Sequence, residues 1–229
     1  MTGPNPPSRY RDGARAIAPI AVAAAAFAAS FGILARAAGF DAVAAIVMSA
    51  TTFAGSAQFA VVSTLETGGA VAAAIVAAVL LNARYAPISV SVAPLFSGSP
   101  LRRLFESQLI VDESWVISRR PDGRFDRRIL IGAGAVLYVV WVTGTAVGVL
   151  VGDAIADPET LGLDAAFPAL FLALLVPQLS SRRALAVAVL AALIALVLVP
   201  LTPPGVPIIA SVLGVLVGLR RTAAGEGPR

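Results

Sequence analysis

Seven apolar runs, separated by short polar links, make up most of this chain. A membrane-spanning helix needs about 20 apolar residues, within a range of about 17–25. Two of the runs reach that length only with their flanking residues or in a bilayer that adapts to them. The pattern predicts an all-α integral membrane protein, a polytopic helical bundle. The runs cover residues 14–35, 42–64, 70–96, 129–151, 165–179, 184–199 and 206–219, and those at 165–179 and 184–199 are among the short ones.

Composition supports the membrane prediction. The 229 residues are 58% hydrophobic and 13% charged, and their mean hydropathy is +0.88. Ordinary soluble chains are about 45–50% apolar and about 25% charged. A soluble fold of this length could not hide so much apolar surface, whereas lipid solvates it. The net charge of +4 does not indicate nucleic-acid binding, because the basic residues lie between apolar runs and no aromatic stripe accompanies them.

Missing residue types exclude several kinds of chemistry. The chain has no Cys and no His, and all 17 basic residues are Arg. Disulfides, Cys/His metal sites and Ser-His or Cys-His catalysis are excluded, as is a P-loop, which needs a Lys. We therefore expect no enzyme activity, metal, cofactor or nucleotide. Transport would draw on a gradient or a separate energising partner, and coupled protons would need Asp or Glu carriers.

The chain is predicted to form one transmembrane domain over residues 14–219. Residues 1–13 are rich in Pro and Gly and lack the layout of a signal peptide, so we expect a disordered cytoplasmic tail. Residues 97–128 form the only extended polar stretch, predicted to be a cytoplasmic loop. Residues 220–229 are predicted to be a second cytoplasmic tail.

Arginine placement predicts the orientation, since cytoplasmic loops of membrane proteins are rich in Arg. Arginines gather in the N-terminal tail, the 97–128 loop, the 180–183 link and the C-terminus, whereas the 152–164 loop holds four acidic residues and no basic one. Both termini are therefore expected on the cytoplasmic side of an inner membrane.

The first half of the chain does not fit this orientation as seven simple crossings. Its two Arg-rich ends require an even number of crossings, but it contains three apolar runs. One run should be re-entrant or broken, unless the N-terminal tail lies outside. Polar interruptions in the third run make it the leading suspect, and a broken segment at membrane depth indicates a substrate path.

A polar motif interrupts the second run. Thr51, Ser56 and Gln58 place hydroxyl and amide groups beside Gly55, and on a helix Thr51, Gly55 and Gln58 would share one face. If Gly55 breaks the helix, exposed backbone groups could bind the charged ends of an amino acid. Alternatively, the polar side chains bond to neighbouring helices and Gly55 permits close packing. The residues alone do not decide between the two.

A second polar motif, Leu81-Asn82-Ala83-Arg84-Tyr85-Ala86-Pro87, interrupts the third run. An Arg at the centre of a membrane helix costs about 2.5–3.5 kcal/mol on insertion scales, so it should have a partner. Arg84 could hold a substrate carboxylate in a bidentate fork. The alternative is a structural pair with an acidic residue such as Glu66 or Asp164, or with carbonyls at a helix break.

The remaining acidic residues give weaker signals. Asp112 and Glu113 lie in the basic loop, where salt bridges with nearby arginines are favoured over acid–base chemistry. Asp164 precedes an apolar run, so it is either a helix N-cap or a proton-responsive gate residue at the outer mouth.

Four segments together give the chain a likeness to a known family. FAGSAQF at 53–59, LNARYAPISVSVAP at 81–94, DES at 112–114 and LGLDAAFPALFLALLVP at 161–177 resemble the AzlC family, the large subunits of branched-chain amino acid exporters. The resemblance spans about residues 14–219, and FAGSAQF is its most specific piece.

The resemblance implies export of leucine, isoleucine, valine and their analogues, together with a small AzlD-type membrane subunit. It leaves open the exact substrate, the coupling ion and the oligomeric state. Many relatives have Leu-Asn-Leu-Arg-His, where this chain has Tyr85 in place of the His. If that His couples protons in relatives, this chain does so differently or not at all.

Two hypotheses follow. The first is a secondary transporter subunit whose substrate-binding residues are Thr51, Gly55, Ser56, Gln58, Asn82 and Arg84, with Tyr85 and Asp164 in coupling or gating. The second is a non-transporting membrane scaffold or assembly subunit, whose polar motifs serve only helix packing. An intramembrane protease is poorly supported, because no nucleophile–base pair or acidic dyad is apparent.

Overall fold

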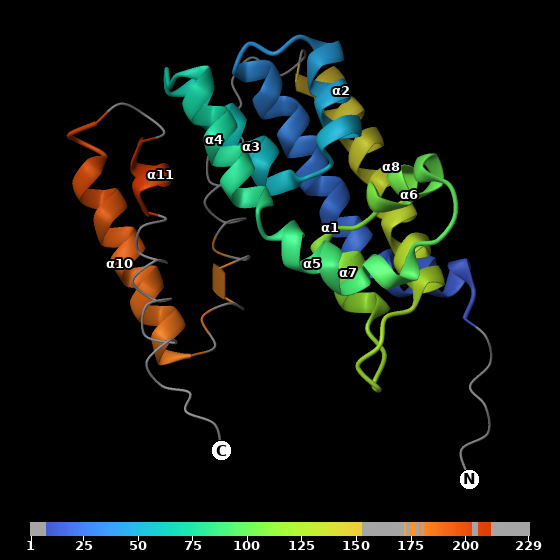
Figure 1. Cartoon of the computed structure of the whole chain (residues 1–229). Helices are drawn as coiled ribbons and strands as arrows, with labels where there is room; N and C mark the ends of the chain where they lie inside the picture. The colour runs from blue at the N-terminus through green and yellow to red at the C-terminus, as the bar shows by residue number, and fades with distance from the viewer. Residues whose placement is uncertain are drawn as a thin grey trace, which may run out of the picture. The chain divides into compact units, whose positions relative to one another are not determined.

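The computed structural model describes residues 8–152, 172, 175, 176, 179, 181–202 and 206–211 (Figure 1). The chain divides into two compact units. One comprises Met1–Gly55 and Asn82–Ala156, and the other comprises Ser56–Leu81 and Asp157–Arg229.

Helices account for all the regular structure in the described residues, which contain no strand. The predicted all-α class is therefore confirmed. The helices are α1 (Tyr10–Ala37), α2 (Ala42–Thr52), α3 (Gly55–Glu66), α4 (Val71–Asn82), α5 (Tyr85–Val92), the short 3-10 helix η1 (Ala93–Leu95), α6 (Pro100–Ser107), α7 (Asp112–Ser118), α8 (Arg127–Gly152), α10 (Arg182–Leu198) and α11 (Val206–Ser211).

Three segments of the described chain are long and apolar enough to cross a membrane: Tyr10–Ala37, Val71–Leu95 and Arg127–Gly152. The prediction of seven apolar segments is not confirmed as such. The run at 184–199 forms α10, whereas most of the runs at 165–179 and 206–219 lies outside the described residues. The C-terminal tail, 220–229, also lies outside them. At the other end, α1 begins at Tyr10, inside the stretch predicted to be a disordered tail.

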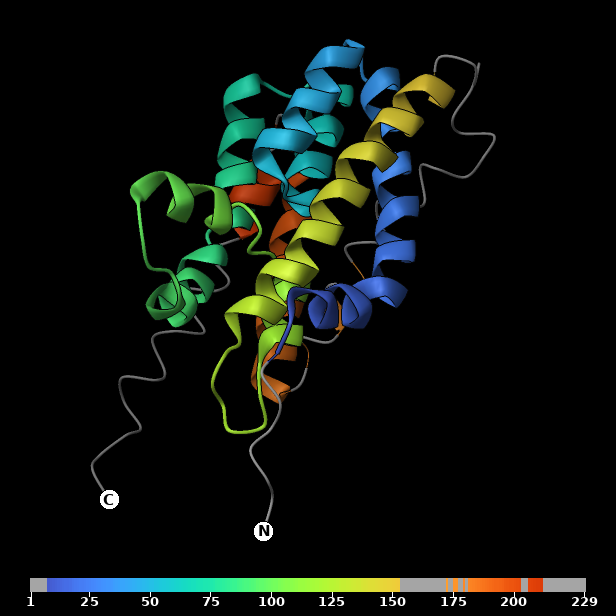
Figure 2. The same cartoon turned by 90° about the vertical axis from the view of Figure 1, so that its right-hand side faces the viewer.

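Helices α1 and α8 lie side by side and run in the same direction (Figures 1 and 2). Their N-terminal ends meet where Gly132 lies against Tyr10, and their C-terminal ends meet where Gly148 lies against Ala29. A Cβ atom on either glycine would collide with the carbonyl oxygen of the facing residue. Small residues let membrane helices approach to backbone contact, and here they fix α1 and α8 in parallel register.

The N-terminal part of α1 is steeply inclined to the rest of the helix (Figure 2). Pro19 lies inside the helix, where it removes one backbone hydrogen bond and its ring crowds the preceding turn. Sharp kinks in helices commonly occur at proline. The bend brings Gly13 against Ile129 at the beginning of α8.

The second apolar run is broken rather than continuous. Helix α2 ends at Thr52, and Phe53 takes a left-handed conformation with φ 41° before α3 begins at Gly55. A residue in the left-handed conformation commonly marks the end of a helix. Of the two alternatives left open by the sequence, a broken helix is the one observed, with the break at Phe53 rather than at Gly55. Thr51 and Gln58 therefore belong to different helices.

The third run is interrupted as predicted, but less severely. Helix α4 ends at Asn82, a turn occupies Ala83 and Arg84, and α5 resumes at Tyr85. The whole segment Val71–Leu95 keeps the length and hydropathy of a membrane span, whereas α2 has only 11 residues. Both runs are therefore interrupted, and the second is the one whose helices are shorter than a membrane span.

Replacing Gly148 with leucine should destabilise the protein, because the side chain would force α1 and α8 apart. Overpacking typically costs about 1–3 kcal/mol, and here the obstacle is the backbone of the facing helix. Thermal unfolding of purified protein in detergent would show a lower Tm. Gly152→Ala is the matched control, since its Cβ would lie 3.2 Å from the nearest atom of α1. Equal Tm values for both variants would contradict the close packing.

Candidate functional site

The break between α2 and α3 lies beside the middle of α8. The Phe53 ring stands edge-on to the Tyr138 ring, with centroids 5.1 Å apart. The Trp141 ring covers Gly55, where an added Cβ would come within 2.7 Å of the indole. Tyr138 and Trp141 are close to the midpoint of the 26-residue helix α8. If α8 crosses the bilayer, the break is therefore near mid-membrane depth.

Two side chains bind the carbonyl groups at the end of α2. The amide nitrogen of Gln108 donates to the carbonyl oxygens of Thr51 at 2.9 Å and Ala50 at 3.3 Å. The hydroxyl of Tyr138 donates to the Ala50 oxygen at 2.9 Å. The last carbonyl groups of a helix have no partner within the helix, and unpaired groups are costly in hydrocarbon. Gln108 and Tyr138 therefore stabilise the break.

A buried hydrogen bond fixes α2 to α8 one turn before the break. The hydroxyls of Ser49 and Thr145 lie 2.8 Å apart, and both residues are fully buried. Buried hydroxyls need such partners. The pair fixes the depth at which α2 ends.

Arg84 is paired with the central loop. Its guanidinium lies 3.0 Å from the carboxylate of Asp112, and the side chains are 34% and 33% exposed. The guanidinium also lies 5.3 Å from the centre of the Tyr85 ring, within cation–π range. Asp112 is thus a partner of Arg84 that the sequence had not named, and Asp164, one of the partners it had named, lies outside the described residues. The pair confirms that Asp112 bridges an arginine, although one of the third run rather than of the loop.

Asn82 lies two residues before Arg84. Its side-chain oxygen is buried and accepts no hydrogen bond from the described residues. Buried acceptors without a protein donor call for a specific explanation, such as water or a ligand. The region around Arg84 therefore offers both a cationic fork and an acceptor.

The segment from Gln108 to Asp112 is braced from behind. Leu109 packs against Gly134 of α8 so closely that a Cβ there would collide with the Leu109 carbonyl. The hydroxyl of Ser114 lies 3.0 Å from the Leu109 carbonyl and 3.0 Å from the Val111 N–H that donates to it. The segment thus holds Gln108 and Asp112 in defined positions on the first unit.

Glu113, next to Asp112, is the carboxyl group most affected by burial in this region. Burial raises the pKa of Glu113 above its ordinary value. The Asp112 carboxylate raises this pKa further, whereas a backbone hydrogen bond and the Arg84 charge oppose the shift. A carboxyl group that holds its proton more strongly than usual can exchange protons nearer neutral pH.

The other predicted site residues are only partly brought together. Thr51 and Arg84 are joined through the 108–112 segment. Ser56 and Gln58 belong to the second unit, where both are buried, and Asp164 lies outside the described residues. Sequence reasoning missed Gln108 and Tyr138, because nothing in a loop glutamine or a membrane-run tyrosine indicates a distant helix end.

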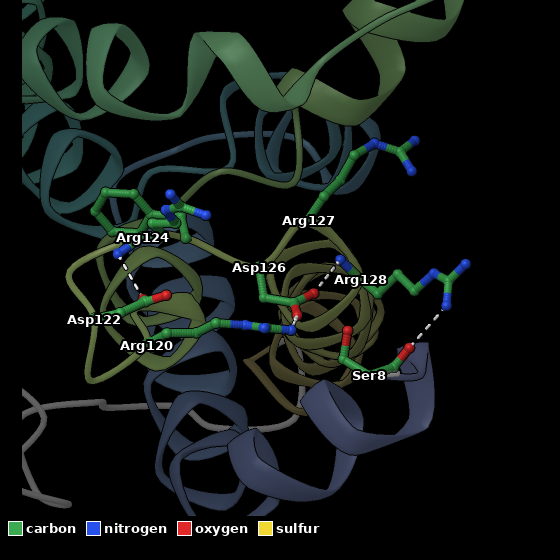
Figure 3. A pocket seen from close by; sticks show the side chains of 8 residues that line it. Ser8, Arg120, Asp122, Arg124, Asp126, Arg127 and Arg128 are labelled. Carbon is green, nitrogen blue, oxygen red and sulfur yellow. Dashed lines mark hydrogen bonds and ion pairs between the residues drawn. The ribbon is translucent and has the colours of Figure 1, made fainter. Parts of the chain in front are cut away.

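A second polar cluster surrounds the beginning of α8, in a pocket of about 470 Å³ (Figure 3). Asp126, whose side chain is only 6% exposed, forms an ion pair with Arg120. It also caps α8 by accepting from the N–H groups of Arg128 and Ile129. Arg127 points away from it in Figure 3 and pairs with Glu106. Because Arg120 and Arg127 pair with acidic residues and Arg128 donates to the Ser8 carbonyl, we assign the cluster to anchoring of α8. The lining residues are Ser8, Arg120, Asp122, Arg124, Phe125, Asp126, Arg127 and Arg128.

No group of His, Cys, Asp and Glu in the described part of the chain could hold a metal ion. The polar groups near the break are hydroxyl, amide, carbonyl, guanidinium and carboxylate groups. Such groups can bind the charged ends of a small zwitterion.

Tyr138→Phe should lower stability by about 0.5–1.5 kcal/mol, the usual contribution of one hydrogen bond. The Ala50 carbonyl would lose its shorter hydrogen bond while the ring contact with Phe53 stays. Thermal unfolding in detergent would measure this loss. Tyr10→Phe is the control, since the Tyr10 hydroxyl meets Arg127 only at 3.4 Å on an exposed surface. A larger loss in the control would contradict the role given to Tyr138.

Asp126 should make the fold less stable in acid. Burial opposes its ionisation, but hydrogen bonds from Ser8, Arg120 and the α8 backbone outweigh burial and lower its pKa. The stabilisation is therefore present above the ordinary Asp pKa of about 3.9 and is lost as pH falls through the lowered value. Asp126→Ala should cost about 0.5–2 kcal/mol at neutral pH, and Asp126→Asn less because it keeps the cap. Tm values measured from pH 3 to 7 would test this; a wild-type Tm independent of pH would contradict it.

Comparison with known proteins places these features in a family. The AzlC family, described as AzlC protein, matches residues 19–155. An uncharacterized membrane protein of Archaeoglobus fulgidus is 34% identical over 173 residues, covering 72% of this chain and 73% of the relative. An uncharacterized membrane protein of Helicobacter pylori is 24% identical over 152 residues, covering 65% of this chain and 66% of the relative. No solved structure matches.

The family match begins at Pro19 in α1 and ends just beyond α8. It includes the break after Thr52, the Arg84–Asp112 pair and the braced segment between α6 and α7. The match covers more than half of the chain, and it agrees with the resemblance seen in the motifs. This chain is a membrane protein of the AzlC family, a family linked to transport rather than to enzymatic chemistry.

Proposed function

We propose that this chain is a permease subunit that exports branched-chain amino acids by gradient-driven secondary transport. The observation that carries the proposal is the end of α2, which lies beside the middle of α8. It belongs to the same unit as the guanidinium of Arg84. Transporters commonly bind substrate at interrupted helices near the bilayer midplane. Family membership supports the class of activity, and the substrate is taken from the resemblance of the motifs.

The proposal includes a re-entrant second run. Since α1 and α8 are parallel and both are long enough to span, residues between them must cross the membrane an odd number of times. Two apolar runs lie in this interval, so one crosses and the other returns. Val71–Leu95 is long enough to cross, whereas the second run is interrupted by Phe53 into helices of 11 and 12 residues. We therefore assign the re-entrant role to the second run.

Each charged end of the substrate has a chemically matched group. The Arg84 guanidinium can hold a carboxylate by two parallel hydrogen bonds. The C-terminal end of a helix carries partial negative charge and favours cations, so the carbonyls of Ala50 and Thr51 suit the ammonium group. Apolar walls would accept the branched side chain, and the Asn82 oxygen is a further acceptor.

The remaining parts of the proposal concern coupling and assembly. We propose that the transporter works with a small AzlD-type subunit in the bacterial inner membrane, with its Arg-rich loop and both termini in the cytoplasm. Tyr85 contacts Arg84 directly and is proposed to tune its charge, and Asp164 is proposed as an outer gate. Glu113 is the candidate proton carrier in a chain that has no His.

Arg84→Ala should abolish export of labelled leucine or reduce it at least about tenfold, and Arg84→Lys should restore little of it. Lys keeps the charge but loses the planar fork. Gln58→Ala should reduce export as well, in accord with its place in the FAGSAQF motif. Efflux from cells at matched protein levels is the measurement, and Arg102→Ala is the control, because Arg102 pairs with Glu106 on the loop surface.

The scaffold hypothesis makes the opposite prediction. Unchanged efflux in both the Arg84 and Gln58 variants would reject these site assignments. Reconstitution of the chain with its small subunit in liposomes separates the two functions. Leucine movement under an imposed proton gradient supports transport, and its absence with correctly folded protein supports a scaffold.

A further inference from the structure

One five-residue segment of the central loop contacts both polar groups that the proposed site depends on. Gln108 donates its amide N–H to the carbonyls of Ala50 and Thr51. Asp112, four residues later, pairs its carboxylate with Arg84. All of these residues belong to one compact unit. The segment therefore links the end of α2 to the interruption of the third run.

The chemistry of these contacts is that of an amino acid. A free amino acid offers N–H donors from its ammonium group and a carboxylate as its acceptor. Gln108 brings an N–H donor to the helix-end carbonyls, and Asp112 brings a carboxylate to the guanidinium. We propose that the Gln108–Asp112 segment is a tethered occupant of the transport site, which the substrate must displace. This inference rests on the proposed function and adds what closes the site and how the site opens.

The contacting side chains are accessible enough to be exchanged. Arg84 and Asp112 are about one-third exposed, and the Gln108 bond to Thr51 is also exposed. The backbone behind them is held by Ser114 and Gly134. Displacement can thus begin with the two side chains while the loop backbone stays in place.

The spacing of the two contacts predicts how the site changes on binding. An α-amino acid carries both charged groups on one carbon, whereas Gln108 and Asp112 are four residues apart. A substrate must therefore take the two positions in sequence or draw them together. Drawing them together would couple binding to movement of α2 relative to Arg84, which is a change of the kind that alternating access requires.

A tethered occupant and a purely structural cap predict opposite effects on affinity. Removing a competitor raises the fraction of protein that is ready to bind, so the apparent Kd falls. Removing a structural support disturbs the site, so the apparent Kd rises. For one or two hydrogen bonds the expected gain in affinity is about two- to tenfold.

The test uses leucine and two half-substrates with the full chain and its small subunit. Isopentylamine carries only the cationic end, and 4-methylpentanoate carries only the carboxylate. Gln108→Ala should tighten binding of isopentylamine about two- to tenfold, and Asp112→Asn should do so for 4-methylpentanoate, each with little effect on the other half-substrate.

Ser107→Ala is the control, because its hydroxyl bonds only to the Leu104 carbonyl of its own helix. Weaker or unchanged binding in both variants, with leucine still bound by wild type, overturns the inference and leaves the function standing.

A second readout does not depend on the substrate. Because the chain has no Cys, Ala50→Cys gives a single thiol at the end of α2. Adding Gln108→Ala should speed its modification by a small cationic thiol reagent at least about threefold, with no change at Ala133→Cys, which is fully buried. An unchanged rate at position 50, or an equal rise at position 133, overturns the tethered occupant. If no form binds leucine or either half-substrate, the proposed function fails and the ligand assignment with it, whereas a faster rate at position 50 alone would still show that Gln108 closes the end of α2.

Discussion

The carbonyl groups at the end of α2 are the point on which the rest of the structure depends. A helix that stops within the membrane leaves carbonyls that lipid cannot satisfy, and each unpaired group costs several kcal/mol. In this protein Gln108 and Tyr138 donate to them, one from the central loop and one from α8. Gln108 reaches α2 because the loop folds back toward it, and the Ser114 and Gly134 contacts hold the loop in that position.

The parallel packing of α1 and α8 supplies the frame for this arrangement. Backbone contact at Gly148 and Gly132 fixes the register of the two helices, and the Ser49–Thr145 bond then sets where α2 ends along α8. Because α1 and α8 are parallel and both are long enough to span, our proposal places an odd number of crossings between them. The α1–α8 pair is thus the frame beside which the shorter helix α2 and the loop segment 108–112 come into contact.

The sequence predicted the all-α class of the fold and the two interrupted apolar runs, but not the contacts that side chains make at the interruptions. The lengths of the apolar runs were sufficient to predict an all-α membrane protein. The polar interruptions correctly marked both broken segments. The break lies at Phe53, next to the polar motif, because this phenylalanine takes a left-handed conformation that its residue type does not indicate. The pairing of Arg84 with Asp112 was also missed, since Asp112 comes from a loop whose acids Glu106 and Asp126 pair with arginines of that loop or of the beginning of α8.

Gln108 and Tyr138 show why such contacts are hard to predict. Each meets Ala50 across a large sequence separation, 58 and 88 residues respectively, and each is an ordinary residue for its own segment. The requirement they meet, a donor for an unpaired carbonyl, appears only once the helix is known to stop. A physical rule can predict that a donor must exist, whereas only the packed structure identifies it.

Sidedness of single cysteines in this naturally Cys-free chain tests the central claim most directly, namely that the second apolar run enters the membrane and returns. Cysteines placed at Ala37, Thr67 and Ser97, each exposed in the structure, can be labelled with an impermeant maleimide from either side of the membrane. The account predicts that positions 37 and 67 label from the same side and position 97 from the other. Labelling of position 67 from the side opposite to position 37 would contradict it, because the second run would then cross the bilayer.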